Sequence, residues 1–186
     1  FIFYNGSLRF IGTAPGVNLF TIVTEGIKKT GVFVNETYDR IVQCAEKFNL
    51  DFIQLHGTES PELCRKLQNS GKGVIKAIPV SQYSDFNFCK PYTDCCDYFL
   101  FDTRTRRHGG SGEKFDWSIL NGYEEEKQFF LSGGIGPGDT STIINIKHEM
   151  LYGVDLNSGF EVYPGIKDYA LLETFINEIH KTENEI

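Results

Sequence analysis

The segment QFFLSGGIGPGDTSTIINIKHEMLYGVDLNSG, residues 128–159, decides the fold class of this chain. It contains two apolar runs, 128–133 and 151–157, separated by a stretch of helical character at 139–146. Both runs are apolar at successive positions, which is typical of parallel strands covered on both faces. Each run is followed by glycine and serine. The segment therefore predicts a strand–helix–strand unit with its small-residue loops at one edge of a parallel sheet.

The same alternation extends over the rest of the chain. Further strand-like runs are expected at 1–4, 31–35, 51–57, 73–80 and 97–103. Helices are expected at 36–48, from Ser60-Pro61-Glu62 onward, at 116–120 and at 169–180, with weaker signals at 14–23 and 81–95. Seven strands alternating with helices indicate an α/β fold with a parallel sheet. Periodicity alone does not distinguish an open doubly wound sheet from a barrel that lacks one strand.

Length and charge restrict the class of protein. The 186 residues, 40% hydrophobic and 23% charged, fit a single globular domain over residues 1–186. This length is short for a complete (β/α)₈ barrel, which typically needs about 250 residues. The net charge of −7 argues against a nucleic-acid or membrane partner, because both favour a basic surface. A small anionic substrate remains compatible, since a few local donors can dominate at a site.

Cysteine usage indicates the compartment. The five cysteines are odd in number and contain no C-x-x-C pair: Cys44, Cys64, Cys89, Cys95 and Cys96. This pattern favours reduced thiols over a disulfide or zinc framework. The sequence shows no signal peptide and no apolar run of about 18 residues. We therefore expect a cytoplasmic protein.

Glycine-rich stretches follow three of the expected strands, at Gly109–Gly112, at Gly133-Gly134 and at Ser158-Gly159. Glycine lets backbone N–H groups approach a phosphate closely. Any one of these loops could be only a tight turn. The last two strands carry such loops in succession, as in phosphate-binding barrels. The sequence thus predicts a phosphate site at these last two loops, unrelated to a P-loop because no Gly-Lys-Ser/Thr follows.

Two carboxylates also follow strands. Asp102 ends the run 97–103 and is a candidate general acid or base, as is typical at the carboxyl end of a barrel strand. It could equally accept hydrogen bonds from the backbone or from Arg104. Asp155 is placed similarly in the last run and could bind substrate hydroxyls or act as a structural acceptor.

Arg9 and His56 are weaker candidates. Arg9 follows the first run and could hold a carboxylate through its planar guanidinium, although a single arginine is more often only solvated. His56 ends the run 51–57, where a hydrogen-bonded structural role is favoured over that of a ligand or a base. None of the five cysteines ends a strand, so none is a candidate nucleophile or base.

In their order along the whole chain, these segments resemble the phosphoribosylanthranilate isomerase family. The resemblance rests on an ordered set of short blocks: Phe1-Ile2-Phe3-Tyr4, Ser7-x-Arg9-Phe10-Ile11, Gly31-Val32-Phe33-Val34-Asn35, Gln54-Leu55-His56-Gly57, Lys76-Ala77, Phe101-Asp102-Thr103, Gly109-Gly110-Ser111-Gly112, Phe115-Asp116-Trp117, Leu131-Ser132-Gly133-Gly134, Gly153-Val154-Asp155, Asn157-Ser158-Gly159, Glu161 and Pro164-Gly165-x-Lys167-Asp168. Each block alone is modest evidence, whereas the ordered set is specific.

The resemblance implies a (β/α)₈ TIM barrel that uses no metal or organic cofactor. It implies an Amadori rearrangement of a small phosphorylated substrate, with Asp102 as general acid and Arg9 on the anthranilate carboxylate. Asp155 is expected to bind substrate. Phosphate is expected at Gly133, Gly134, Ser158 and Gly159, and a mobile cover at Gly109, Gly110, Ser111 and Gly112. A monomer and a homodimer both remain open.

The chain departs from the family pattern in one respect. The family's general base is a cysteine at the end of the first strand, and that strand would precede Phe1. By this comparison strand 1 and helix 1 are absent from the chain, which would then be an N-terminally incomplete barrel. Two alternatives are therefore kept: a truncated, inactive barrel that only binds a phosphorylated ligand, and another phosphate-binding barrel enzyme, such as one similar to ribulose-phosphate epimerase or indole-glycerol-phosphate synthase.

Overall fold

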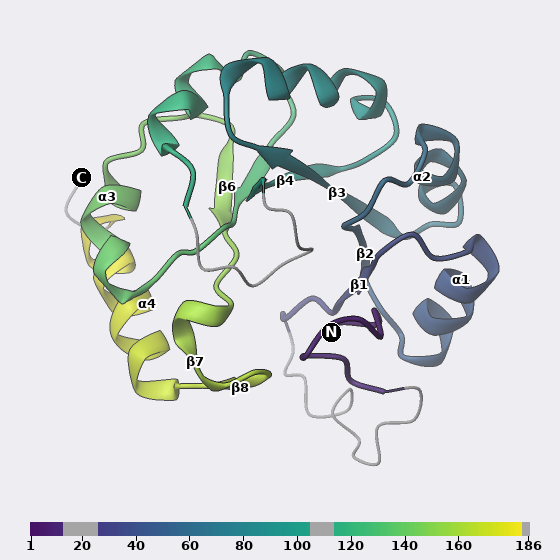
Figure 1. Ribbon diagram of the computed structural model, residues 1–186, viewed down its shortest axis with the longest axis horizontal. Helices are drawn as coiled ribbons and strands as arrows, with labels where there is room; N and C mark the ends of the chain where they lie inside the picture. Colours follow the sequence, from purple (N-terminus) through teal and green to yellow (C-terminus); the bar gives the residue numbers. More distant parts are fainter. Residues whose placement is uncertain (13–25, 105–113, 184–186) are drawn as a thin grey trace. The chain divides into compact units, whose positions relative to one another are not determined.

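The computed structural model describes residues 1–12, 26–104 and 114–183 (Figure 1). Strands β1 to β6 follow one another in chain order within one sheet. The pairs β1–β2, β2–β3 and β5–β6 are parallel. The prediction of an α/β fold with a parallel sheet is therefore confirmed. The chain divides into two compact units, residues 1–78 with 84–100 and residues 79–83 with 101–186, which are described separately.

The first unit is built from strand–helix repeats. Its elements are β1 (Thr30–Phe33), α1 (Tyr38–Lys47), β2 (Phe52–Leu55), α2 (Pro61–Gln68), β3 (Gly73–Val80) and the 3₁₀ helices η1 (Tyr83–Phe88) and η2 (Lys90–Tyr92). Ser60 caps α2 as predicted, since its hydroxyl accepts a hydrogen bond from the N–H of Leu63 and Pro61 opens the helix. The expected helix at 14–23 lies outside the described residues.

The segment 1–4 is shorter as a strand than expected. Ile2 forms isolated parallel bridges with Val32 and with Phe10. Beside β1, the N–H of Phe3 donates to the carbonyl of Val32 at 2.9 Å, and the N–H of Val32 donates to the carbonyl of Phe1 at 2.8 Å. The segment thus adds to β1 through a few backbone hydrogen bonds.

The second unit continues from β4 (Tyr98–Thr103). It contains η3 (Trp117–Gly122), β5 (Phe129–Leu131), η4 (Pro137–Asp139), α3 (Thr140–Ile144), β6 (Leu151–Val154), η5 (Ser158–Phe160), β7 (Glu161–Tyr163), β8 (Ile166–Lys167) and α4 (Tyr169–Glu183). The helix expected at 116–120 is a 3₁₀ helix. The antiparallel pair β7–β8 was not expected from the sequence. Its signal is Pro164-Gly165, a turn pair in which Gly165 takes a φ of +85°.

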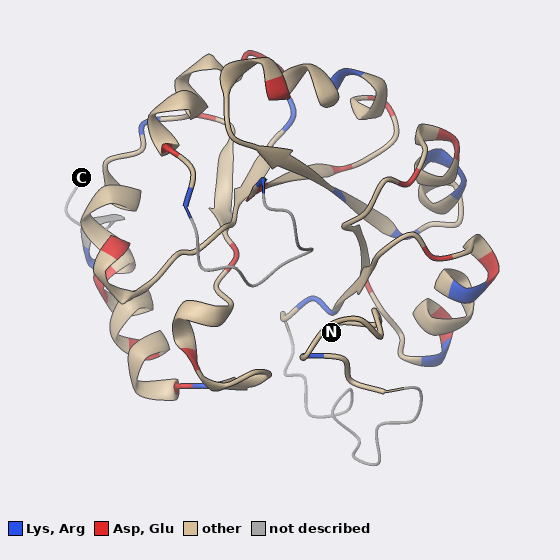
Figure 2. Cartoon of the chain, viewed as in Figure 1, with Lys and Arg blue, Asp and Glu red and all other residues tan. Residues whose placement is uncertain are grey.

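Charge is almost excluded from the sheet. Strands β1 to β6 contain two charged side chains, Lys76 in β3 and Asp102 in β4. Helices α1 and α2 carry both signs of charge on their ribbons (Figure 2). A charged side chain within an apolar strand requires partners or a function. Among the described helices, none has the length and hydrophobicity needed to span a membrane.

Candidate active site

The carboxyl ends of β4, β5 and β6 lie at one edge of the second unit. The N–H of Ser132 donates to the carbonyl of Phe101 at 2.8 Å, and the N–H of Asp155 donates to the carbonyl of Leu131 at 2.8 Å. Asp102, the loop after β5 and the loop after β6 consequently share that edge. The expectation that the loops after these strands lie at one edge of the sheet is confirmed for the loops after β5 and β6.

Asp102 is half-buried at the end of its strand. Its Oδ1 accepts a hydrogen bond from the N–H of Thr103 at 2.9 Å. Asp155, also half-buried, accepts a hydrogen bond from the hydroxyl of Ser132 at 3.3 Å through Oδ2. Both carboxylates are thus partly buried at the ends of neighbouring strands, where a group that transfers protons or binds hydroxyls can be placed.

The loop after β5 requires glycine. Gly133 and Gly134 have φ values of +93° and +67°, in the left-handed region that side chains rarely adopt. A Cβ on Gly133 would also collide with the hydroxyl and the backbone nitrogen of Thr103. The loop therefore turns tightly against the end of β4.

The loop after β6 touches the loop after β5. A Cβ on Gly159 would collide with the carbonyl oxygen of Ile135 and crowd the Cα of Gly136. Backbone therefore packs on backbone, and glycine is needed at Gly159 for this close approach.

Both loops present backbone donors. In the described part of the chain, the N–H groups of Gly133, Gly134, Ser158 and Gly159 donate to no other residue. The neighbouring N–H of Gly136 is already used, since it donates to Asp139 Oδ2 at 2.6 Å. Clustered unpaired N–H groups on glycine-rich turns form a concavity suited to an anion.

The other expected residues belong to the first unit or lie outside the described residues. Arg9 is half-buried in the first unit, where its N–H donates to the hydroxyl of Ser7 at 3.1 Å. The expected cover, Gly109, Gly110, Ser111 and Gly112, lies outside the described residues.

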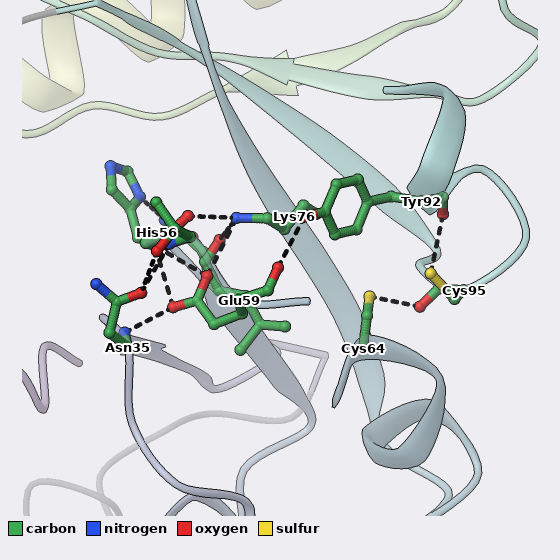
Figure 3. A network of polar contacts seen from close by, with 11 residues as sticks. Asn35, His56, Glu59, Cys64, Lys76, Tyr92 and Cys95 are labelled. Atoms are coloured by element: carbon green, nitrogen blue, oxygen red, sulfur yellow. Dashed lines mark hydrogen bonds and ion pairs between the residues drawn. The ribbon is translucent and has the colours of Figure 1, made fainter. Parts of the chain in front are cut away.

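A buried polar network joins Lys76, in the middle of β3, with the loops that follow β1 and β2 (Figure 3). Lys76 donates through Nζ to the carbonyls of Leu55 and Gly57, at 3.2 and 2.7 Å, and pairs with Glu59 Oε2 at 3.1 Å. The side chains of Lys76 and Glu59 are 3% and 1% exposed. All three ammonium protons thus have acceptors within the chain, and Lys76 has a structural role.

The network extends to neighbouring loops. Asn35, whose φ is 51°, donates its N–H to Glu59 Oε1 at 2.8 Å. Tyr92 donates its hydroxyl to the carbonyl of Glu59 at 2.7 Å, and burial raises the pKa of Tyr92. His56 Nδ1 lies 3.0 Å from the side-chain amide of Gln54, within hydrogen-bonding distance, which fits the structural role favoured for this histidine.

The cysteines are buried in the first unit. The thiol of Cys64 donates to the carbonyl of Cys95 at 2.6 Å (Figure 3). Burial raises the pKa of Cys64 and of Cys44 above that of a free thiol. None of the five follows the carboxyl end of a strand, so none is placed to act as a base at the glycine loops.

Sequence reasoning missed Glu59, Lys76 and Lys167 as organising residues. Lys76 could have been found, because a lysine inside the apolar run 73–80 must be paired when buried. Glu59 and Lys167 lie in loops and short strands, where no periodic pattern identifies a partner.

A family model described as N-(5'phosphoribosyl)anthranilate (PRA) isomerase matches residues 17–178. A relative from Parabacteroides distasonis named N-(5'-phosphoribosyl)anthranilate isomerase is 48% identical over 180 residues, covering 96% of this chain and 81% of the relative. Among solved structures, the phosphoribosyl anthranilate isomerase of Thermotoga maritima has a TM-score of 0.86 at 35% identity, covering 97% of this chain and 86% of that one. A phosphoribosyl anthranilate isomerase in complex with reduced 1-(o-carboxyphenylamino)-1-deoxyribulose 5-phosphate has a TM-score of 0.83 at 32% identity, with the same coverage.

Proposed function

The chain belongs to the N-(5'-phosphoribosyl)anthranilate isomerase family, and we propose that it catalyses the Amadori rearrangement for which that family is named. Its fold is the (β/α) barrel of the family. The aminoaldose N-(5'-phosphoribosyl)anthranilate becomes the aminoketose 1-(2-carboxyphenylamino)-1-deoxyribulose 5-phosphate. Substrate and product are isomers, so the reaction needs proton transfers and no co-substrate.

One observation carries the proposal beyond family membership. Two glycine loops in backbone contact present N–H groups that donate to no residue of the described chain, at the edge where β4, which carries Asp102, ends together with β5 and β6. This arrangement supports a phosphate anchor next to a proton donor. A phosphorylated sugar held by its phosphate would place the rest of the ring near that carboxyl group.

Asp102 is proposed as the general acid. It donates a proton to the ribose ring oxygen, the bond from C1 to that oxygen breaks, and a Schiff base forms between C1 and the anthranilate nitrogen. Removal of the C2 proton then gives an enolamine, which tautomerises to the ketone. In the family that this chain resembles, the base for that step is a cysteine at the end of the first strand.

The other residues are proposed to bind substrate. Arg9 would hold the anthranilate carboxylate through its guanidinium. Asp155, oriented by the hydroxyl of Ser132, would accept hydrogen bonds from ribose hydroxyls. Gly109–Gly112 would cover the bound substrate. A cytoplasmic location and a single barrel domain over residues 1–186 remain predictions from the sequence.

A substrate panel tests the proposal. The protein is incubated separately with N-(5'-phosphoribosyl)anthranilate, with ribulose 5-phosphate and with 1-(2-carboxyphenylamino)-1-deoxyribulose 5-phosphate, and products are separated by chromatography. We expect conversion of the first to its ketose isomer. Epimerisation of ribulose 5-phosphate or formation of an indole from the third compound, without isomerisation of the first, would support another barrel enzyme.

A further inference from the structure

The β7–β8 hairpin follows directly on the glycine loop after β6 and folds back toward it. Glu161 and Lys167 are cross-strand partners in this hairpin. Next to its base, the N–H of Asp168 donates to the carbonyl of Phe160 at 2.8 Å. The hairpin therefore returns the chain to Phe160, the last residue of η5 (Ser158–Phe160).

Lys167 reaches from the hairpin to that loop. Its Nζ lies 3.2 Å from the carbonyl oxygen of Leu156, 3.0 Å from that of Asn157, 2.9 Å from Asn157 Oδ1 and 3.1 Å from Glu161 Oε1. An ammonium has three protons, and four oxygens within the chain already surround it. Lys167 thus has no proton left for a ligand, and any effect on a ligand must act through the loop.

The carbonyl of Asn157 and the N–H of Ser158 belong to the same planar, trans peptide unit and point in opposite directions. An ammonium fixed on the carbonyl oxygen consequently fixes the direction of the N–H. A positive charge on the carbonyl side also polarises the peptide and makes its N–H a stronger donor.

Glu161 holds the lysine in place. Its side chain is 4% exposed, and Oε1 accepts hydrogen bonds from Lys167 Nζ and from the N–H of Gly165, at 3.1 and 3.2 Å. The carboxylate thereby joins the two strands and closes the turn at Gly165. The lysine is anchored at a defined point behind the loop.

We propose that Lys167, anchored by Glu161, is a positioning residue that orients the backbone N–H groups of the Ser158-Gly159 loop toward the phosphate of the substrate. This inference rests on the proposed function, because it assigns a role within the proposed phosphate site. The lysine selects phosphorylated over unphosphorylated ligands without touching the phosphate itself.

The test measures phosphate preference. Reduced 1-(o-carboxyphenylamino)-1-deoxyribulose 5-phosphate and its dephosphorylated counterpart are titrated into the protein by calorimetry. The dissociation constant of the dephosphorylated ligand is divided by that of the phosphorylated ligand, so that a high ratio means a preference for phosphate. Lys167→Met should reduce this ratio by roughly tenfold, as expected for a lost charge-assisted contact. Lys147→Met, at an exposed lysine of the same unit, should leave it unchanged. A general loss of folded protein would reduce the binding of both ligands equally and leave the ratio of their dissociation constants constant.

Glu161→Gln separates positioning from direct contact and serves as a second variant should Lys167→Met not fold. Positioning predicts that the preference for the phosphorylated ligand falls, because the lysine loses its anchor. A rise or no change would overturn the proposal, since a released lysine contacting phosphate directly would strengthen that preference.

The ligand preference of the wild-type protein distinguishes a failure of this inference from a failure of the proposed function. Wild-type protein without any preference for the phosphorylated ligand would contradict the phosphate site itself. A clear wild-type preference that Lys167→Met leaves intact would overturn the role of Lys167 alone.

Discussion

At the scale of residues, the two charged side chains of strands β1 to β6 differ in burial and in proposed role. Lys76 is enclosed by two carbonyls and Glu59, so its charge is fully used within the fold. Asp102 is half-buried one residue before the end of β4. The sequence predicts Asp102 as a candidate, because its place after an apolar run is a local feature. The partners of Lys76 come from β2 and the loop that follows it, and no local pattern specifies them.

Asp102→Asn and Arg9→Ala should have different kinetic effects. Asparagine keeps the shape of Asp102 without an acidic proton, so we expect kcat to fall by about 10²- to 10⁴-fold with little change in KM. Alanine at Arg9 removes a proposed contact to a carboxylate that does not react, so KM should rise roughly tenfold with kcat nearly constant. Steady-state kinetics on both variants decide, and the reverse pattern would contradict the assigned roles.

Tyr92 should make stability fall at alkaline pH. Burial raises its pKa above the ordinary value of 10.0, so the folded state disfavours the phenolate. The stabilisation is fully present below the unfolded pKa and is lost as pH rises through the folded pKa. Tyr92→Phe should cost about 1 kcal/mol at neutral pH, by removing the hydrogen bond to the carbonyl of Glu59.

The measurement is urea unfolding of both proteins at about pH 8 and about pH 11. The difference in the free energy of unfolding between the two pH values should shrink in Tyr92→Phe. Tyr163→Phe, at a side chain 71% exposed, serves as the control and should keep the wild-type difference. If the free energy of unfolding of Tyr92→Phe falls as steeply between the two pH values as that of the wild type, other groups cause the loss of stability at alkaline pH.

At the scale of elements, the strands and most helices were predictable because burial on both faces leaves continuous apolar runs. The hairpin β7–β8 was missed since its strands, Glu161–Tyr163 and Ile166–Lys167, are too short for a periodic signal. The glycine loops were predicted as a pair, but their backbone contact was not. That contact depends on the approach of Gly159 to Ile135, which no sequence pattern reports.

Gly159→Ala tests the paired loops. The new Cβ would collide with the carbonyl of Ile135, so the loops must separate and their N–H groups diverge. Affinity for a phosphorylated ligand, measured by calorimetry, should fall at least roughly tenfold. Gly138→Ala is the matched control, because a Cβ there meets no atom within 4 Å and should leave affinity unchanged. Equal affinities for the two variants would argue against a phosphate site between these loops.

At the scale of the whole molecule, sequence periodicity predicted parallel β/α repeats without deciding between a barrel and an open sheet. Periodicity reports local burial, whereas closure depends on contacts between distant strands. The ordered blocks of the family resemblance supplied that decision, and solved relatives covering 97% of the chain confirm the family fold. The buried network around Glu59 remained unpredictable for the same reason as closure, since it joins the loops after β1 and β2 with β3 and with Tyr92 of η2.

We propose that this protein moves the carbonyl function of its substrate from C1 to C2. The test is carbon-13 NMR of N-(5'-phosphoribosyl)anthranilate labelled at ribose C1. The substrate is incubated with catalytic amounts of the natural protein. We expect the anomeric C1 signal to be replaced by that of a methylene carbon bonded to nitrogen, and Asp102→Asn to slow this change by at least about 100-fold. A C1 signal that stays anomeric with protein and substrate in equal amounts would contradict the proposed isomerisation.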